Sequence, residues 1–275
     1  MKFLSNFLNY FLYFFIYSFG GWICECIYCS VPAKKFINRG FLYGPYCPIY
    51  GFGALIVTVL LDGYLNNPVL VFFLGMMLTS LLEYVTSFVM EKLFNKKWWD
   101  YSHYKFNING RVCLLNSTLF GIMSLFVIYV LHPQVSDLIN LIPLHYQAWV
   151  SLILFLLFAY DLFNTIKAQL RKNKDIAEIE DCLLELRQVI HDFSYNDEEP
   201  LSVQLQAMFD STDADERLKQ VLERVNAKFK AMQAHQPYTE LRLSKAFPNQ
   251  IVSERLRNIR NSAEVIKKKL EKWGE

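Results

Sequence analysis

The first part of this sequence has few charges, and the whole chain lacks the common signatures of soluble enzymes. No G-x-x-x-x-G-K-[ST] stretch is present, so nothing predicts an ATP-binding loop. The G-x-S-x-G, H-E-x-x-H and G-x-G-x-x-G patterns are absent as well. These absences disfavour an enzyme of a common type and predict no bound cofactor, but they leave unfamiliar chemistry open.

Charge divides the chain into two parts. Residues 1–166 hold 9 Lys+Arg and 7 Asp+Glu, whereas residues 167–275 hold 19 of each. The whole chain is 53% hydrophobic and only 20% charged, which is typical of a membrane protein. The charged part is balanced in sign and has no basic patch interleaved with aromatics, so nucleic acid is not a predicted partner. We expect a transmembrane domain over 1–166 and a cytoplasmic helical tail over 167–275.

Five apolar stretches are long enough to cross a hydrocarbon core of about 30 Å at about 1.5 Å per residue. The first is not interpreted as a signal peptide, because its apolar part is long and no small-x-small cleavage site is evident. The His132-Pro133 pair is expected to stop the fourth. The sequence therefore predicts an all-α, polytopic transmembrane helical bundle. Its spans are roughly 7–28, 46–65, 68–92, 112–131 and 146–166.

The basic residues of the connecting links predict the orientation of the spans. Lys and Arg occur in the links after the first and third spans and directly after the fifth, and the other two links contain none. Because positively charged loops stay in the cytoplasm, five spans alternate consistently only with the N-terminus outside and the tail inside. We expect a multi-pass protein of the cytoplasmic membrane, in contact with the lipid bilayer.

The tail contains three apolar seams with heptad spacing, which predict amphipathic helices. Breaks between them are expected at 195–200 and 237–249. Such helices form either a small bundle that packs on itself or a coiled coil that joins copies or partners, so a homo-oligomer is one of two open interpretations. The seams are Ile176, Ile179, Leu183, Leu186 and Ile190; Leu218, Leu222, Val225, Phe229 and Met232; and Leu256, Ile259, Ala263, Ile266, Leu270 and Trp273.

Two carboxylates inside the predicted spans are the first candidates for a functional site. Glu83 lies slightly past the middle of the third span, and Glu25 lies toward the cytoplasmic end of the first. A charge at such depth costs about 2.5–3.5 kcal/mol on insertion scales and usually faces a cavity or a partner. Both could pair with Arg39 or Arg111, either to fix helix packing or to form a polar path or ligand site. Asp161, near the inner surface, is interpreted as an ordinary boundary residue.

Residues 98–121 combine two tryptophans with polar side chains and run directly into an apolar segment. The tryptophans fit an interfacial aromatic belt. Asp100 is harder to explain as a purely structural residue, because Arg111 can return to it across the loop. The entry to the second span at 39–51 is rich in glycine and proline and is expected to be irregular and partly re-entrant. Together these stretches predict a polar, aromatic pocket on the cytoplasmic side. Its candidate residues are Glu25, Arg39, Glu83, Asp100 and Arg111.

The cysteines and glycines of the spans bear on metal binding and on helix packing. Three of the six cysteines cluster at the inner end of the first span, but the sequence has no paired CxxC…CxxC frame and no histidine clearly placed to help. We therefore predict no metal site, and a reducing inner compartment disfavours disulfides. Glycines in the first four spans predict close approach of the helices.

Three blocks of the chain resemble a known family. They are Asn38-Arg39-Gly40-Phe41-Leu42-Tyr43-Gly44-Pro45 with Pro48-Ile49-Tyr50-Gly51, Leu82-Glu83-Tyr84 with Thr86-Ser87, and Trp98-Trp99-Asp100-Tyr101-Ser102 with Phe106-Asn107 and Gly110-Arg111-Val112-Cys113-Leu114. On these residues the chain is similar to the family called Putative ABC-transporter type IV, over about residues 7–131. The tail stretch Leu243-Ser244-Lys245-Ala246-Phe247-Pro248 also resembles tails of such proteins. The resemblance implies the membrane (permease-like) subunit of a transporter that is powered by a separate ATPase.

Two other functions stay open on the residues alone. The chain could be a membrane scaffold or sensor that acts through its helical tail. It could also be an enzyme that acts on a lipid at the inner surface, with Asp100 or Glu83 as acid or base and Arg39 and Arg111 holding a phosphate. The residue types identify neither a substrate nor a catalytic residue.

Overall fold

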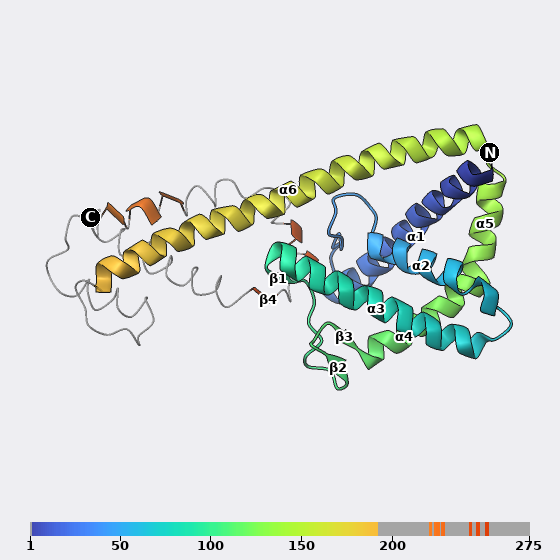
Figure 1. The fold of residues 1–275 in the computed structure, drawn as a ribbon, viewed down its shortest axis with the longest axis horizontal. Coiled ribbons are helices and arrows are strands. Elements are labelled where there is room, and N and C mark those ends of the chain that lie inside the picture. Colours follow the sequence, from blue (N-terminus) through green and yellow to red (C-terminus); the bar gives the residue numbers. More distant parts are fainter. Residues whose placement is uncertain are drawn as a thin grey trace. The chain divides into compact units, whose positions relative to one another are not determined.

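The computed structural model describes residues 2–191 and, beyond them, residues 220–221, 223–225, 227–228, 242–243, 246–247 and 251–252. Within this part, four helical stretches are long and apolar enough to cross a membrane, and a fifth apolar helix is shorter. The chain is therefore an all-α, multi-pass membrane protein, as predicted (Figure 1). The four long stretches are Phe3–Ala33, Pro68–Phe94, Leu114–Asn140 and Leu144–Arg171.

The second predicted span is the short helix. α1 covers Lys2–Ala33, and α2 covers Pro48–Leu60, followed by a 3₁₀ turn at Asp62–Tyr64. α2 begins at a proline, which suits a first helical position because proline lacks the N–H that would be unpaired there. Its 13 residues extend about 20 Å, which is less than the hydrocarbon core of about 30 Å. The non-helical chain before Pro48 matches the irregular entry that the glycines and prolines predict.

α1 and α2 touch through a glycine. A Cβ at Gly51 of α2 would lie 2.3 Å from the Ser18 hydroxyl and 2.6 Å from the Phe14 carbonyl oxygen, both in α1. Only a residue without a side chain fits such a contact, which confirms the close approach expected from the glycines of these spans.

The fourth span is longer than predicted. α3 covers Pro68–Phe94, and α4 (Leu114–Phe126) continues through a π-helical turn at Val127–Leu131 into α5 (His132–Asn140). The prediction that His132-Pro133 stops this helix was wrong. Proline is tolerated inside membrane helices where a local π turn rearranges the hydrogen bonds that its missing N–H would disrupt, and such a turn ends two residues before Pro133. The chain bends where α4 passes into α5 (Figure 1).

α6 covers Leu144–His191 and joins the fifth span to the first tail seam without a break. Its 48 residues extend about 72 Å, far beyond a membrane. The chain divides into two compact units: residues 1–93, 97–167 and 239–251 form the first, and residues 94–96, 168–238 and 252–275 form the second. β1 (Lys96–Lys97), β2 (Asn107–Ile108), β3 (Val112–Cys113) and β4 (Ile251–Val252) are two-residue strands.

Among the residues of the second unit whose side chains the structure describes, two of the predicted seam residues are buried. Ile179 of α6 is 1% exposed and Val225 is fully covered. Arg224 and Lys228, which flank Val225, form ion pairs with Glu185 (2.8 Å) and Glu178 (3.3 Å) of α6. The third predicted seam, 256–273, lies outside the described residues.

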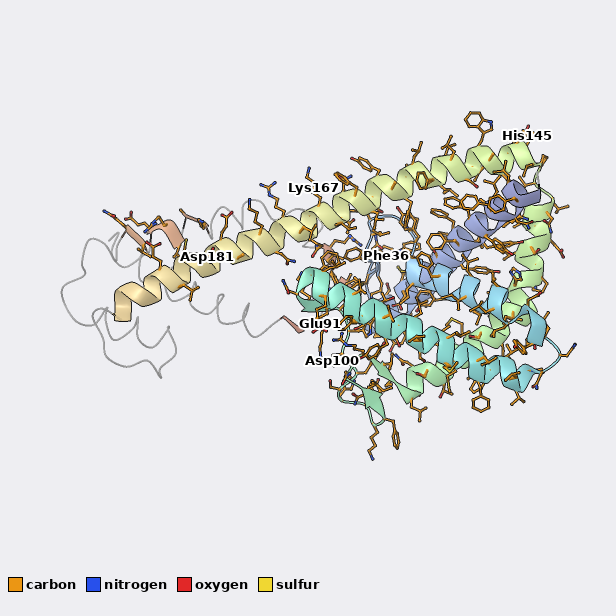
Figure 2. The ribbon with its side chains drawn as sticks, in the orientation of Figure 1. Phe36, Glu91, Asp100, His145, Lys167 and Asp181 are labelled. Carbon is orange, nitrogen blue, oxygen red and sulfur yellow. The ribbon has the colours of Figure 1, made fainter. Side chains whose placement is uncertain are left out.

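In the first unit, the basic loops and His145 lie at opposite ends of the spanning helices. Phe36, Glu91, Asp100 and Lys167 lie at one end of the spanning helices, and His145 lies at the other (Figure 2). The basic loops after α1 and α3 and the basic stretch after the fifth span thus share one end. At the opposite end, the Tyr17 hydroxyl lies 2.8 Å from His132 Nδ1, and the Tyr13 hydroxyl donates to Ser136 Oγ at 3.1 Å, so α1 packs against α5.

Candidate functional site

The α1–α2 loop, residues 34–47, is held in place by Asp161 of α6. Asp161 is 7% exposed. Its Oδ1 accepts the Tyr43 N–H at 3.0 Å, and its Oδ2 accepts the Gly44 N–H at 2.8 Å and the Tyr46 O–H at 2.6 Å. Burial and this carboxylate raise the pKa of Tyr46, so its hydroxyl stays a donor. Asp161 is thus more than a boundary residue: it supplies the acceptors for two backbone N–H groups of a non-helical loop.

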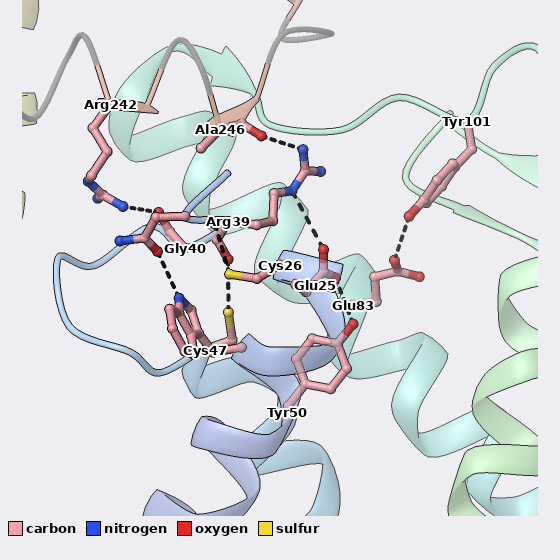
Figure 3. Close-up of polar contacts among 12 residues, drawn as sticks. Glu25, Cys26, Arg39, Gly40, Cys47, Tyr50, Glu83, Tyr101, Arg242 and Ala246 are labelled. Carbon is pink, nitrogen blue, oxygen red and sulfur yellow. Dashed lines mark hydrogen bonds and ion pairs between the residues drawn. The ribbon is translucent and has the colours of Figure 1, made fainter. Parts of the chain in front are cut away.

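The same loop carries Arg39 to Glu25 of α1. Arg39 Nε lies 3.5 Å from Glu25 Oε2, and the Tyr50 hydroxyl of α2 donates to Glu25 Oε1 at 2.7 Å (Figure 3). Two thiols fix the backbone of Arg39: its N–H donates to Cys26 Sγ at 3.3 Å, and the Cys47 thiol donates to its carbonyl at 3.4 Å. The pairing of Glu25 with Arg39 that the sequence suggested is therefore present.

The α3–α4 loop, residues 95–113, folds back through a β-hairpin. β2 and β3 pair antiparallel, with Asn107 opposite Cys113. Asn109 and Gly110 both have positive φ (53° and 68°), and the Arg111 N–H donates to the Ile108 carbonyl at 2.9 Å. This is a type I′ turn, which favours Asn-Gly because both central residues need positive φ. The Asn-Gly pair between Ile108 and Val112 is the sequence signal that could have predicted the hairpin.

The hairpin loop places Tyr101 on Glu83 of α3. Glu83 is 5% exposed, and its Oε1 accepts the Tyr101 hydroxyl at 3.2 Å (Figure 3). Among the described residues, its second oxygen, Oε2, has no hydrogen-bond partner. Burial first, then the Glu83 carboxylate and the more distant Glu25, raise the pKa of Tyr101, so this hydroxyl stays protonated and donates. Glu83 and Glu25 are thus neighbours, each bound by one tyrosine; we call Glu25, Arg39, Tyr50, Glu83 and Tyr101 the polar network.

Arg111 binds elsewhere on α3. Its Nη1 lies 2.6 Å from Glu91 Oε2 and 3.4 Å from the Ser87 hydroxyl, and its guanidinium lies 5.4 Å from the Phe88 ring centroid. The Trp99 indole N–H donates to the Arg111 carbonyl at 3.0 Å. Arg111 therefore fastens the hairpin to α3, and its partner is Glu91 rather than Glu83 or Asp100.

Asp100 supports the turn of its own loop. Its Oδ1 accepts the Ser102 hydroxyl at 2.6 Å and the Ser102 N–H at 3.2 Å. A Cβ at Gly110 would lie 2.2 Å from this oxygen. Arg111 does not return to Asp100, because the type I′ turn directs Arg111 toward α3. Glu25, Arg39 and Glu83 are brought together, whereas Asp100 and Arg111 have structural contacts of their own.

Direct contacts join the two loops. Phe41 packs edge-on against Trp98, with ring centroids 5.2 Å apart. Trp98 also packs against Phe247 at 5.1 Å, and Arg242 donates to the Gly40 carbonyl at 2.7 Å. Among the described residues, no group of three or more His, Cys, Asp or Glu side chains is arranged to hold a metal ion.

The comparison with known protein families concerns this same part of the chain. The family model described as Putative ABC-transporter type IV matches residues 12–166. The chain belongs to this family. No curated protein and no solved structure matches it. The family match contains all five candidate residues and Asp161, so the polar network lies wholly inside the type IV region, whereas Arg242 and Phe247 lie beyond it.

Proposed function

We propose that this chain is the membrane, permease-like subunit of a transporter that works with a separate ATPase subunit. The family description supports a transporter of the ABC type. The sequence has no phosphate-binding loop, so ATP hydrolysis would have to come from another chain.

The observation that carries the proposal is the buried carboxylate of Glu83. It lies in α3, one of the helices long enough to cross the membrane, and is 5% exposed. A charged side chain inside a membrane segment usually faces a polar path or pairs with another group. In the part of the chain that the structure describes, one of its oxygens has no partner. That oxygen is an acceptor for a cation or for a polar group of the substrate.

We further propose that the N-terminus lies outside and residues 167–275 form a tail in the cytoplasm. The basic links after α1 and α3 lie at one end of the helices, and positive loops remain in the cytoplasm (Figure 2). The polar network would then lie toward the cytoplasmic side, where an ATPase would bind. A homo-oligomer through the tail helices remains part of the proposal, because five helices enclose little space.

The experiment begins with the natural partner. The full chain, carrying an affinity tag, is purified in mild detergent from its own cells, and the co-purified proteins are identified and quantified. The proposal predicts an ATP-binding subunit in fixed stoichiometry. Inside-out vesicles are then compared for ATP-driven accumulation of solutes from a cell extract, with wild type beside Glu83→Gln.

The matched control is Asp137→Asn, which removes the charge of an exposed carboxylate of α5 that is not part of the polar network. We expect the solutes accumulated by wild type to be lost with Glu83→Gln and retained with Asp137→Asn. If no ATPase co-purifies and wild-type and Glu83→Gln vesicles accumulate the same solutes, the proposed transport function is wrong.

A second function is favoured by one observation. Arg242 and Ala246, which lie more than 200 residues further along the chain, contact the α1–α2 loop. A membrane scaffold or sensor that signals through its tail would need such a contact. If cells that express the chain without residues 195–275 keep its full function, this second candidate fails.

A further inference from the structure

The stretch that begins at Arg242 has no role in the transport proposal, yet its described residues are closely packed. Arg242, Leu243 and Ala246 are 8%, 2% and 1% exposed. The Arg242 guanidinium donates from Nη1 to the Gly40 carbonyl and from Nη2 to the Phe41 carbonyl, both at 2.7 Å. It also lies 5.0 Å from the centroid of the Tyr43 ring. One arginine therefore supplies the donors for two carbonyls of a non-helical loop.

The contact is reciprocal. Arg39 Nη1 donates to the Ala246 carbonyl (Figure 3). The Arg39 guanidinium also stacks over Phe247, 4.3 Å from the ring centroid. Each segment thus places an arginine on backbone carbonyls of the other. A guanidinium is suited to this role, because its planar array of donors binds carbonyl groups while its face stacks on an aromatic ring. Phe247 also packs against Trp98, so the segment touches both loops of the site.

The chain reaches this position by an indirect route. It leaves the first unit at Lys167, builds most of the second unit over 168–238, and returns to the first unit only with Thr239–Ile251. A segment that is tethered in this way binds at high effective concentration without needing a large interface.

We propose that Arg242, Ala246 and Phe247 form a latch that holds the α1–α2 loop, and with it the Arg39–Glu25 ion pair, in place. The latch and the polar network share Arg39: its Nε faces Glu25 at 3.5 Å while its Nη1 binds Ala246. Release of the latch removes the donors of the Gly40 and Phe41 carbonyls and frees Arg39 from Phe247. Displacing Arg242 or Phe247 from the loop would thereby change the polar network. The latch makes no use of the transport proposal and can be tested without a transport assay.

Cys47 is a native reporter of the loop. Its thiol donates to the Arg39 carbonyl at 3.4 Å, and the residue is 9% exposed. Burial raises the pKa of the Cys47 thiol to about 12, so little reactive thiolate is present while the loop is held. Cys113 in β3 is 1% exposed and serves as an internal reference for general unfolding.

The test measures alkylation of the full-length protein by N-ethylmaleimide in lipid nanodiscs, with each cysteine followed by peptide mass spectrometry. Arg242→Ala removes two charge-assisted hydrogen bonds, so we expect Cys47 to react at least about 10-fold faster than in wild type. Phe247→Ala should act in the same direction with a smaller effect. In both variants the rate at Cys113 should stay unchanged.

Arg224→Ala is the matched control, because it removes an arginine that pairs with Glu185 within the second unit. Arg242→Lys keeps the charge but cannot bind both carbonyls in the same plane, so its rate should lie between wild type and Arg242→Ala. The proposal is overturned if Cys47 reacts at the wild-type rate in both Arg242→Ala and Phe247→Ala. It is also overturned if Cys47 and Cys113 accelerate together, because the segment would then stabilise the whole unit rather than the loop.

Discussion

Asp161→Asn tests how the α1–α2 loop is positioned. Asparagine has nearly the same shape as aspartate, so the change leaves the packing of α6 in place. One carboxylate oxygen becomes an NH₂ group, which is a donor. If this group takes the place of Oδ2, it faces the Gly44 N–H, 2.8 Å from Oδ2, and the Tyr46 hydroxyl, 2.6 Å from it. The hydroxyl can rotate and accept, but the backbone N–H cannot.

The structure gives the size of the effect. One hydrogen bond from a backbone N–H to a charged acceptor is lost, and the donor stays buried. Such a bond contributes about 1.5–3 kcal/mol net. Since about 1.36 kcal/mol corresponds to a tenfold change, the fraction of molecules with an open loop should rise about 10- to 150-fold.

Hydrogen–deuterium exchange measures this opening directly. In the full-length protein in nanodiscs, peptides that cover residues 40–47 should exchange faster in Asp161→Asn by this factor. Peptides from the interior of α3 should be unaffected. Asp137→Asn is the control, because Asp137 is an exposed residue of α5. Unchanged exchange of residues 40–47 in Asp161→Asn would refute the role of Asp161 as the acceptor that fixes this loop.

Two glycine substitutions test the packing around the site. Gly51→Ala should lower the thermal unfolding temperature in detergent, because its Cβ would meet Ser18 Oγ at 2.3 Å. Gly20→Ala in α1 is the control and should not lower it, because nothing lies within 4 Å of a Cβ there. Equal unfolding temperatures of the two variants would contradict the close α1–α2 contact. Gly110→Ala should cost about 1–2 kcal/mol of hairpin stability, because φ is +68° and the Cβ would lie 2.2 Å from Asp100 Oδ1. Faster exchange of residues 107–113 checks this, and wild-type exchange there would rule out the type I′ turn.

Long apolar stretches were the part of the fold that the sequence predicted well. The α3 span, for example, begins at Pro68 as expected and ends two residues beyond the predicted position, at Phe94. α2 came out shorter than its apolar stretch, because residues 62–64 form a 3₁₀ turn. The prediction at Pro133 was wrong because the residue types do not reveal the π turn that lets the helix continue past this proline.

The candidate site was predicted in part. Glu25, Arg39 and Glu83 come together because the helix ends that carry them share one end of the bundle, which the spacing of the spans implies. Asp161 was underestimated, because its role depends on two backbone N–H groups of a loop more than 115 residues away in the chain. The partner of Arg111 was missed for a similar reason: only the turn at Asn109-Gly110 decides which way its side chain points.

The proposed position of the polar network requires that the loops after α1 and α3 share the cytoplasmic side of the membrane. Single cysteines introduced at Asn67 and Asn109 and labelled with a membrane-impermeant maleimide, with each site followed by peptide mass spectrometry, test this directly. We predict that Asn109→Cys is labelled only in inside-out vesicles and Asn67→Cys only in intact spheroplasts. Labelling of Asn67→Cys from the cytosolic side, or of Asn109→Cys from outside, would contradict it.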